Sequence, residues 1–105
     1  MEVIKMNEIK GSTNKRGVTS KQLHKNEDVK IMNLILQPGD LVPAHSVPVN
    51  VFFYIVSGKG TLQIGDDKQI VKATDIVPCP PNTEMSLKAD QDEEFNVINV
   101  KTPSL

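Results

Sequence analysis

His45 is the residue whose side chain is best suited to metal binding or catalysis. It lies in the segment PGDLVPAHSVPVNVFFYIVSGKG, residues 38–60. An imidazole can ligate a metal ion or transfer a proton near neutral pH. A metal site needs further donors, but later positions on the same face of an extended chain hold Val47 and Val51. Catalysis by imidazole likewise needs a second titratable or electrophilic group. The pattern favours a structural histidine or loop anchor, with a hydrogen-bonding or acid–base role as the alternative.

Cys79 is the only cysteine, and it lies between Pro78 and Pro80. No lysine, arginine or histidine stands beside it in the sequence to lower its pKa. We therefore expect a buried, unreactive thiol. A single cysteine also excludes an intrachain disulfide and a cysteine-rich zinc site.

The elements that must position these residues are short strands, because runs of β-branched residues alternate with Pro, Gly, Asn and Asp. No stretch shows a helical repeat of apolar positions. The predicted strands are Val3–Met6, Val18–Leu23, Val29–Leu36, Asn50–Val56, Thr61–Ile64, Gln69–Val71, Ile76–Pro78, Glu84–Lys88 and Phe95–Lys101. A chain of 105 residues suits one domain. Within it, residues 1–28 are expected to form an N-terminal strand and connection, and residues 29–105 the barrel proper.

The predicted strand at residues 50–56 is apolar on both faces. Because alternate side chains of a strand share a face, one set points to one side and the other set to the opposite side. The first set is His45, Val47, Val51, Phe53 and Ile55, and the second is Phe52, Tyr54 and Val56. The first is expected to face the barrel interior and the second a further layer or a partner subunit. This pattern predicts a homodimer.

The near-neutral charge of the chain does not indicate a polyanionic partner. The chain has 12 basic and 13 acidic residues and a net charge of −1, so neither nucleic acid nor membrane binding is expected. The basic stretch Lys10–Lys25 is interpreted as an exposed connection and edge strand, with a nucleic-acid-binding arm as the weaker alternative. No apolar run is long enough for a membrane helix, and Glu2 and Glu8 do not suit a signal peptide. A cytoplasmic protein is expected.

The spacing of several of these residues resembles the two motifs of the cupin superfamily of small jelly-roll β-barrels. The first motif has a glycine, two histidines, a glutamate and a closing glycine. This chain matches it at Gly39, His45 and Gly58 but has Val47 and Val51 at the second histidine and the glutamate. The second motif has a glycine, a proline, a second glycine, a histidine and an asparagine. Its positions correspond here to Thr74, Pro80, Asn82, Met85 and Ala89, of which only the proline matches.

The resemblance implies an all-β, single-domain cupin-like jelly-roll barrel without the metal site of the family, because Val47, Val51 and Met85 replace three of its ligands. We expect a protein without a metal cofactor that binds a small apolar ligand or acts through subunit contacts, rather than an enzyme. The candidate lining of the cup is His45, Val47, Val51, Phe53 and Met85. These side chains could instead simply fill the barrel. The alternative function is a metal-dependent isomerase, epimerase or dioxygenase that uses Fe, Mn, Ni or Zn in an atypical ligand set around His45.

Overall fold

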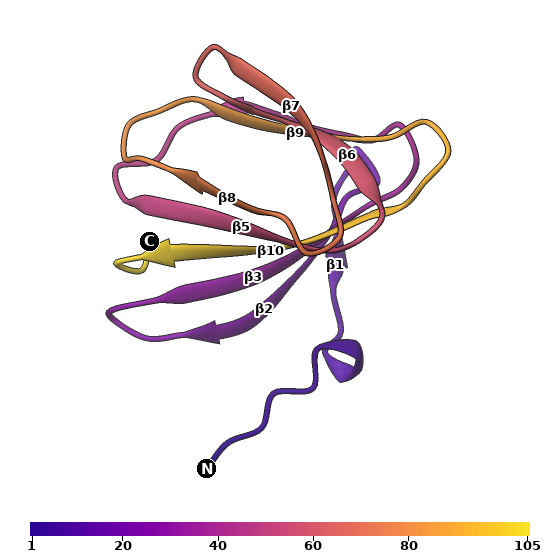
Figure 1. The fold of residues 1–105 in the computed structure, drawn as a ribbon. Coiled ribbons are helices and arrows are strands. Elements are labelled where there is room, and N and C mark those ends of the chain that lie inside the picture. The colour runs from indigo at the N-terminus through magenta and orange to yellow at the C-terminus, as the bar shows by residue number, and fades with distance from the viewer.

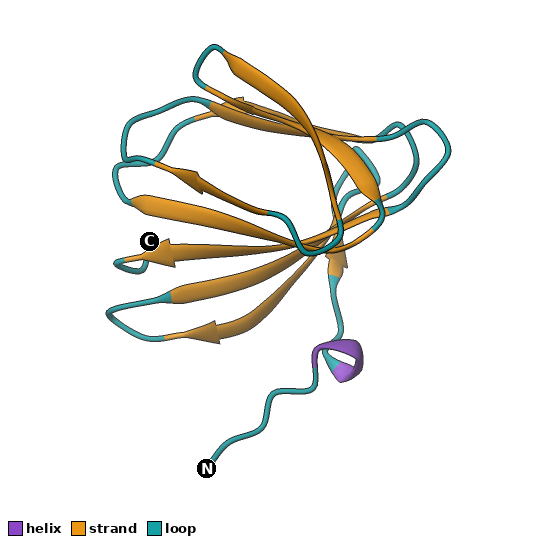
Figure 2. Ribbon diagram, in the orientation of Figure 1, coloured by secondary structure: helices purple, strands orange, loops and turns teal.

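A computed structural model describes residues 1–105. In it, the chain folds into two facing antiparallel β-sheets (Figure 1). The strands are β1 (Ser12–Thr13), β2 (Thr19–Lys25), β3 (Lys30–Leu36), β4 (Leu41–His45), β5 (Asn50–Ser57), β6 (Lys59–Ile64), β7 (Asp67–Lys72), β8 (Ile76–Cys79), β9 (Met85–Ala89) and β10 (Phe95–Thr102). One sheet has the order β1-β2-β3-β10-β5-β8 and the other β4-β9-β6-β7. Loops gather at the two ends of this sandwich (Figure 2). The predicted all-β, jelly-roll-like fold is confirmed.

The alternation predicted for residues 50–56 is present in β5. Val51, Phe53 and Ile55 are buried, whereas Phe52 is 39% exposed on the opposite face. The inward side chains join a core between the sheets that burial of apolar surface stabilises by about 1.5–3 kcal/mol for each large side chain. This core is made by Val18, Leu36, Val51, Phe53, Ile55, Leu62, Val71, Cys79, Met85, Leu87, Ala89, Phe95 and Val97.

The turn between β5 and β6 requires glycine at position 58. Gly58 has φ +81°, and a Cβ there would lie 1.7 Å from the carbonyl oxygen of Glu94. At Gly60, a Cβ would lie 2.6 Å from the ring of Phe95. Gly58 alone joins β5 to β6, whereas Lys59 and Gly60 already belong to β6. The lack of a side chain at Gly58 and Gly60 allows the start of β10 to pass close by.

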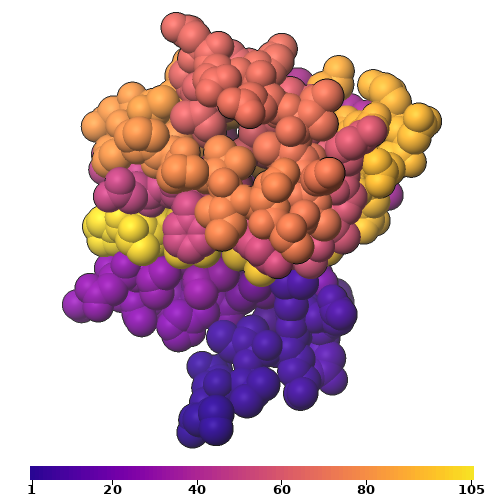
Figure 3. Space-filling view, viewed as in Figure 1, coloured from indigo at the N-terminus to yellow at the C-terminus, as the bar shows by residue number.

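The predicted strand at Val3–Met6 is wrong. This segment pairs with no other strand and leads into a 3₁₀ helix, η1 (Met6–Glu8). Val3 is 65% exposed, and the segment projects from the body of the molecule, in indigo in Figure 3. The reason is that strand propensity measures fit to a paired, half-buried surface, and no neighbouring strand provides one here.

Two strands, β1 and β4, were not predicted. β1 has only two residues, too few to give a pattern. β4 contains Pro43 and lies at the edge of its sheet, where its pairing with β9 shifts register between Val42 and His45. Proline is tolerated at such an edge because it has no N–H to contribute to the ladder.

The Pro-Gly pair at residues 38–39 and the Gly-Asp pair at residues 65–66 are typical of turns, and both turns are present. In the first, the amide of Asp40 donates to the carbonyl oxygen of Gln37 over 2.9 Å, with Gly39 at φ +81°. In the second, Gly65 joins β6 and β7 as a hairpin. None of the helical structure has the length and apolar character required to cross a bilayer.

Candidate functional site

His45 ends β4 and is exposed to solvent. Its Nδ1 donates a hydrogen bond to the carbonyl oxygen of Pro43 over 3.0 Å. The lone pair of Nε2 is then available to accept a hydrogen bond or to bind a metal ion. In the register of β4 and β9, His45 lies opposite Met85. The histidine therefore lies beside one of the positions at which the sequence lacks the family's metal ligands.

The other predicted cup residues form a continuous apolar wall. Val51, Phe53 and Met85 are almost fully buried in the core, and Val47 packs against it. The structure thus brings these four apolar side chains into one core, with His45 outside it at the end of β4. Their role as ligand contacts stays a prediction.

The residues do not fit the metal that the cupin motifs imply. No group of three His, Cys, Asp or Glu side chains comes together in the structure. Cys79 is buried among core residues, its Sγ lies 3.6 Å from the carbonyl oxygen of Pro80, and burial raises the pKa of its thiol. The predicted buried thiol is confirmed, and Cys79 does not extend the donor set of His45.

A cavity of about 280 Å³ lies between the two sheets on the side where β3 faces β4. We call it the polar cavity. Side chains from β2, β3 and β10 line one wall, and side chains from β4 and β9 line the other. The lining residues are Asn14, Val18, Ser20, Lys30, Met32, Leu34, Val42, His45, Leu87, Asn99 and Lys101. Of the predicted site residues, only His45 belongs to this lining.

Two rows of paired residues connect the polar cavity to the predicted cup. Lys101 of β10 is the direct partner of Lys30 on β3 and of Val51 on β5. Asn99 is likewise paired with Met32 and with Phe53. Since paired residues of neighbouring strands share a face, Lys101 and Asn99 point to the interior beside Val51 and Phe53.

The electrostatics of the polar cavity are unusual for a barrel interior. The pKa of Lys101 is lowered, chiefly because the ammonium group loses solvation and also because of the nearby charge of Lys30. Asn99 is only 6% exposed, and its Oδ1 is a buried acceptor without a hydrogen-bond partner. Unpaired buried acceptors of this kind are rare and typically cost about 1–3 kcal/mol.

Asn99, Lys30 and Lys101 were not among the predicted site residues, although the sequence carries a signal for two of them. Phe95 and Val97 are spaced as inward residues of the last strand, and continuing that alternation puts Asn99 and Lys101 on the same face. What the sequence did not indicate was that β3 supplies Lys30 directly opposite Lys101.

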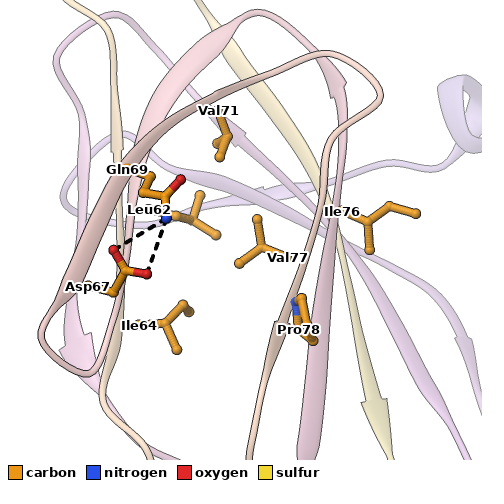
Figure 4. A pocket seen from close by; sticks show the side chains of 8 residues that line it. All are labelled: Leu62, Ile64, Asp67, Gln69, Val71, Ile76, Val77 and Pro78. Atoms are coloured by element: carbon orange, nitrogen blue, oxygen red, sulfur yellow. Dashed lines mark hydrogen bonds between the residues drawn. The ribbon is translucent and has the colours of Figure 1, made fainter.

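A second, more apolar cavity of about 210 Å³ lies on the opposite side of the sandwich, between β8 and the β6–β7 hairpin (Figure 4). Leu62, Val71 and Val77 form its floor. At its rim, Nε2 of Gln69 donates to both carboxylate oxygens of Asp67, at 3.3 and 3.1 Å. Its polar groups satisfy each other, so this cavity offers a ligand mainly apolar contact.

The overall structure is similar to several solved structures. One is the structure of KdgF from Halomonas sp., with a TM-score of 0.91, 16% identity and coverage of 100% of this chain and 96% of that one. Another is a predicted oxalate decarboxylase from Thermotoga maritima, with a TM-score of 0.84, 20% identity and coverage of 98% and 100%. The polyketide cyclase RemF from Streptomyces resistomycificus has a TM-score of 0.88, 12% identity and coverage of 99% and 80%.

These identities are low, so the similarities establish the fold alone. A search of curated proteins found no match. The family model for the cupin domain, Cupin_2, matches residues 32–101, which extend from within β3 into β10. With this sequence match and the two-sheet barrel, the chain belongs to the cupin domain family.

Proposed function

We propose that this protein is a non-metal cupin that binds a small molecule in the polar cavity. The observation that carries the proposal is the cavity itself, which combines five apolar side chains with polar groups that include the unpaired Oδ1 of Asn99. Ligand sites are typically concave and mostly apolar, with a few polar groups that fix orientation. A volume of about 280 Å³ holds roughly nine water-sized groups, so a compact metabolite fits it.

The predicted cup residues have a place in this proposal. Val51 and Phe53 are the strand partners of Lys101 and Asn99, so they form an apolar boundary beside these two lining residues without lining the cavity themselves. Met85 and Val47 support the same boundary near His45. In this arrangement, His45 acts as a hydrogen-bonding group at the rim rather than as a catalyst.

Binding can be tested with a pair of substitutions on β2. Ser20 lines the polar cavity, whereas Lys21 is paired with Asn33 and faces the outside of the sheet. Ser20→Phe should fill the cavity, and Lys21→Phe adds the same ring outside it. Native mass spectrometry of the purified protein should find a small molecule bound to wild type and Lys21→Phe but absent from Ser20→Phe. Equal retention by both variants would contradict binding in this cavity.

The second candidate is a metal-dependent isomerase, epimerase or dioxygenase. Two observations favour it: His45 lines the polar cavity with Nε2 available, and the fold is shared with a polyketide cyclase and a predicted oxalate decarboxylase. Elemental analysis of tag-free protein, incubated with iron, manganese, nickel and zinc, separates the two candidates. Stoichiometric metal that His45→Ala removes would support the enzyme. Metal at background level would support the non-metal binding protein.

A further inference from the structure

The polar cavity contains a pair of positive charges with no acidic side chain beside them. Lys30 and Lys101 are directly opposed partners on β3 and β10, and like charges in that arrangement repel each other. No aspartate or glutamate lines the cavity. The only ion pair of the structure joins Lys59 and Asp90, 3.1 Å apart, and involves neither lysine.

The row of lysines continues to the edge of the sheet. Lys25 on β2 is the partner of Lys30, so Lys25, Lys30 and Lys101 form a line across three neighbouring strands. Lys30 donates a hydrogen bond from Nζ to the main-chain oxygen of Leu105 over 3.2 Å, so its ammonium group already has one partner, which lies outside the cavity lining. Lys101 is the more enclosed of the pair. Such a line of charges attracts anions toward the opening and raises their local concentration.

Asn99 is an independent observation that points to a ligand at the same place. It is the next inward residue before Lys101 on β10, and its Oδ1 is buried without a partner. A bound molecule with a hydroxyl or N–H group would satisfy this acceptor. Met32, Leu34, Val42 and Leu87 provide the apolar surface on either side.

We infer that the ligand of the polar cavity is a small hydroxycarboxylic acid, whose carboxylate binds Lys101 and Lys30 and whose hydroxyl donates to Oδ1 of Asn99. An apolar body of a few carbon atoms would then contact Leu34 and Leu87. This inference rests on the proposed function, because it names the chemical class of ligand for the same cavity. Inorganic phosphate fits less well, because it has no apolar body to contact Leu34 and Leu87.

The test uses isothermal titration calorimetry with three organic probes of matched size and one inorganic anion. They are 2-hydroxy-4-methylpentanoate, the same acid without its hydroxyl, the corresponding neutral hydroxyamide, and inorganic phosphate. We expect the hydroxy acid to bind at millimolar or lower concentration, the deoxy acid several-fold more weakly, and the amide at least about tenfold more weakly. Equal binding of acid and amide, tighter binding of phosphate, or no binding of the hydroxy acid would overturn the inference.

Variants locate the interaction. Lys101→Met keeps the length of the side chain and removes the charge, and it should weaken the hydroxy acid at least about tenfold. Lys72→Met is the matched control, because Lys72 is exposed on β7 and lies outside the cavity. Asn99→Leu should abolish the difference between the hydroxy and deoxy acids. If Lys101→Met binds like wild type, the assignment of the anion site is wrong.

The two proposals fail in different ways. If Ser20→Phe abolishes binding of a small molecule but Lys101→Met does not weaken it, the proposed binding function stands and the carboxylate assignment is rejected. If neither Ser20→Phe nor Lys101→Met changes binding, binding in the polar cavity is rejected altogether. Circular dichroism of each variant, compared with Lys72→Met, shows whether a loss of binding reflects loss of the fold.

Discussion

Lys101 is the direct strand partner of Val51, the residue at the position where the cupin motif has a glutamate. The chain thus has a valine in place of a carboxylate and a half-buried ammonium group beside it. A site arranged this way repels a divalent cation and attracts an anion. The pairing of Val51 with Lys101 thus connects the missing glutamate of the sequence motif with the positive charge of the cavity.

The first prediction concerns the cost of keeping Lys101 in the cavity. Because its pKa is lowered in the folded protein, the unfolded chain binds more protons between that lowered pKa and the ordinary lysine value near ~10.4. Stability should therefore rise with pH as the solution approaches the ordinary value from below. Lys101→Met should increase the free energy of unfolding near neutral pH by up to about 1 kcal/mol, a small gain because solvent screens a half-exposed group.

Urea denaturation of wild type and Lys101→Met across neutral to alkaline pH measures this effect. The difference between the two should shrink as the lysine loses its proton. A variant that is less stable than wild type at neutral pH would show that Lys101 stabilises the fold, and would count against a binding role for its charge.

The second prediction concerns Gly58. Its φ is +81° and an added Cβ would lie 1.7 Å from the main-chain oxygen of Glu94, so the backbone itself would have to move. Gly58→Ala should cost more than about 3 kcal/mol or prevent folding. Gly17 has a similar φ of +88°, but its nearest neighbour is the side chain of Asp40 at 3.3 Å. Gly17→Ala should cost only about 1 kcal/mol.

Thermal or urea unfolding of both variants separates backbone strain from steric overlap. If the two substitutions cost the same, the close approach of Gly58 to the start of β10 contributes nothing beyond its φ, contrary to expectation.

The third prediction concerns the reactivity of Cys79. Burial raises the pKa of this thiol, which reduces the thiolate fraction at neutral pH and also blocks access by reagents. An aromatic disulfide reagent should react with the native protein roughly a hundredfold more slowly than with the protein in concentrated urea, because reaction requires local opening. Comparable rates in the two conditions would mean that Cys79 is accessible in the native state.

The fourth prediction concerns subunit association through the outer face of the six-stranded sheet. Phe52 is 39% exposed there and Ile76, on the neighbouring strand, is 64% exposed. We expect a homodimer that covers this face, since a stable interface typically buries about 1,200–2,000 Å² in total. Light scattering at tens of micromolar should give a dimer for wild type and a monomer for Phe52→Lys.

Ile70→Lys is the control for that experiment, because Ile70 is 72% exposed but belongs to β7 of the other sheet. It should remain dimeric. A wild-type monomer, or a dimer disrupted equally by both substitutions, would reject association through this face.

The sequence by itself determined the all-β fold and the inward face of β5. Alternation is a local property: Val51, Phe53 and Ile55 are spaced two residues apart, and only one of their faces can be buried in a sandwich. The sequence also predicted a buried Cys79, because that prediction depends on the residues beside it. The strand predicted at Val3–Met6 is absent, because a strand also needs a pairing partner, which the local sequence does not reveal.

Only the tertiary structure decided what lies around His45. The pairing of Lys30 with Lys101 joins residues far apart in the chain, and it depends on the register of β3 against β10. A slip of one residue in that register would turn one of the two lysines to the outside. Whether the interior was filled or open was decided in the same way, because the volume left between the sheets depends on how side chains from five strands meet.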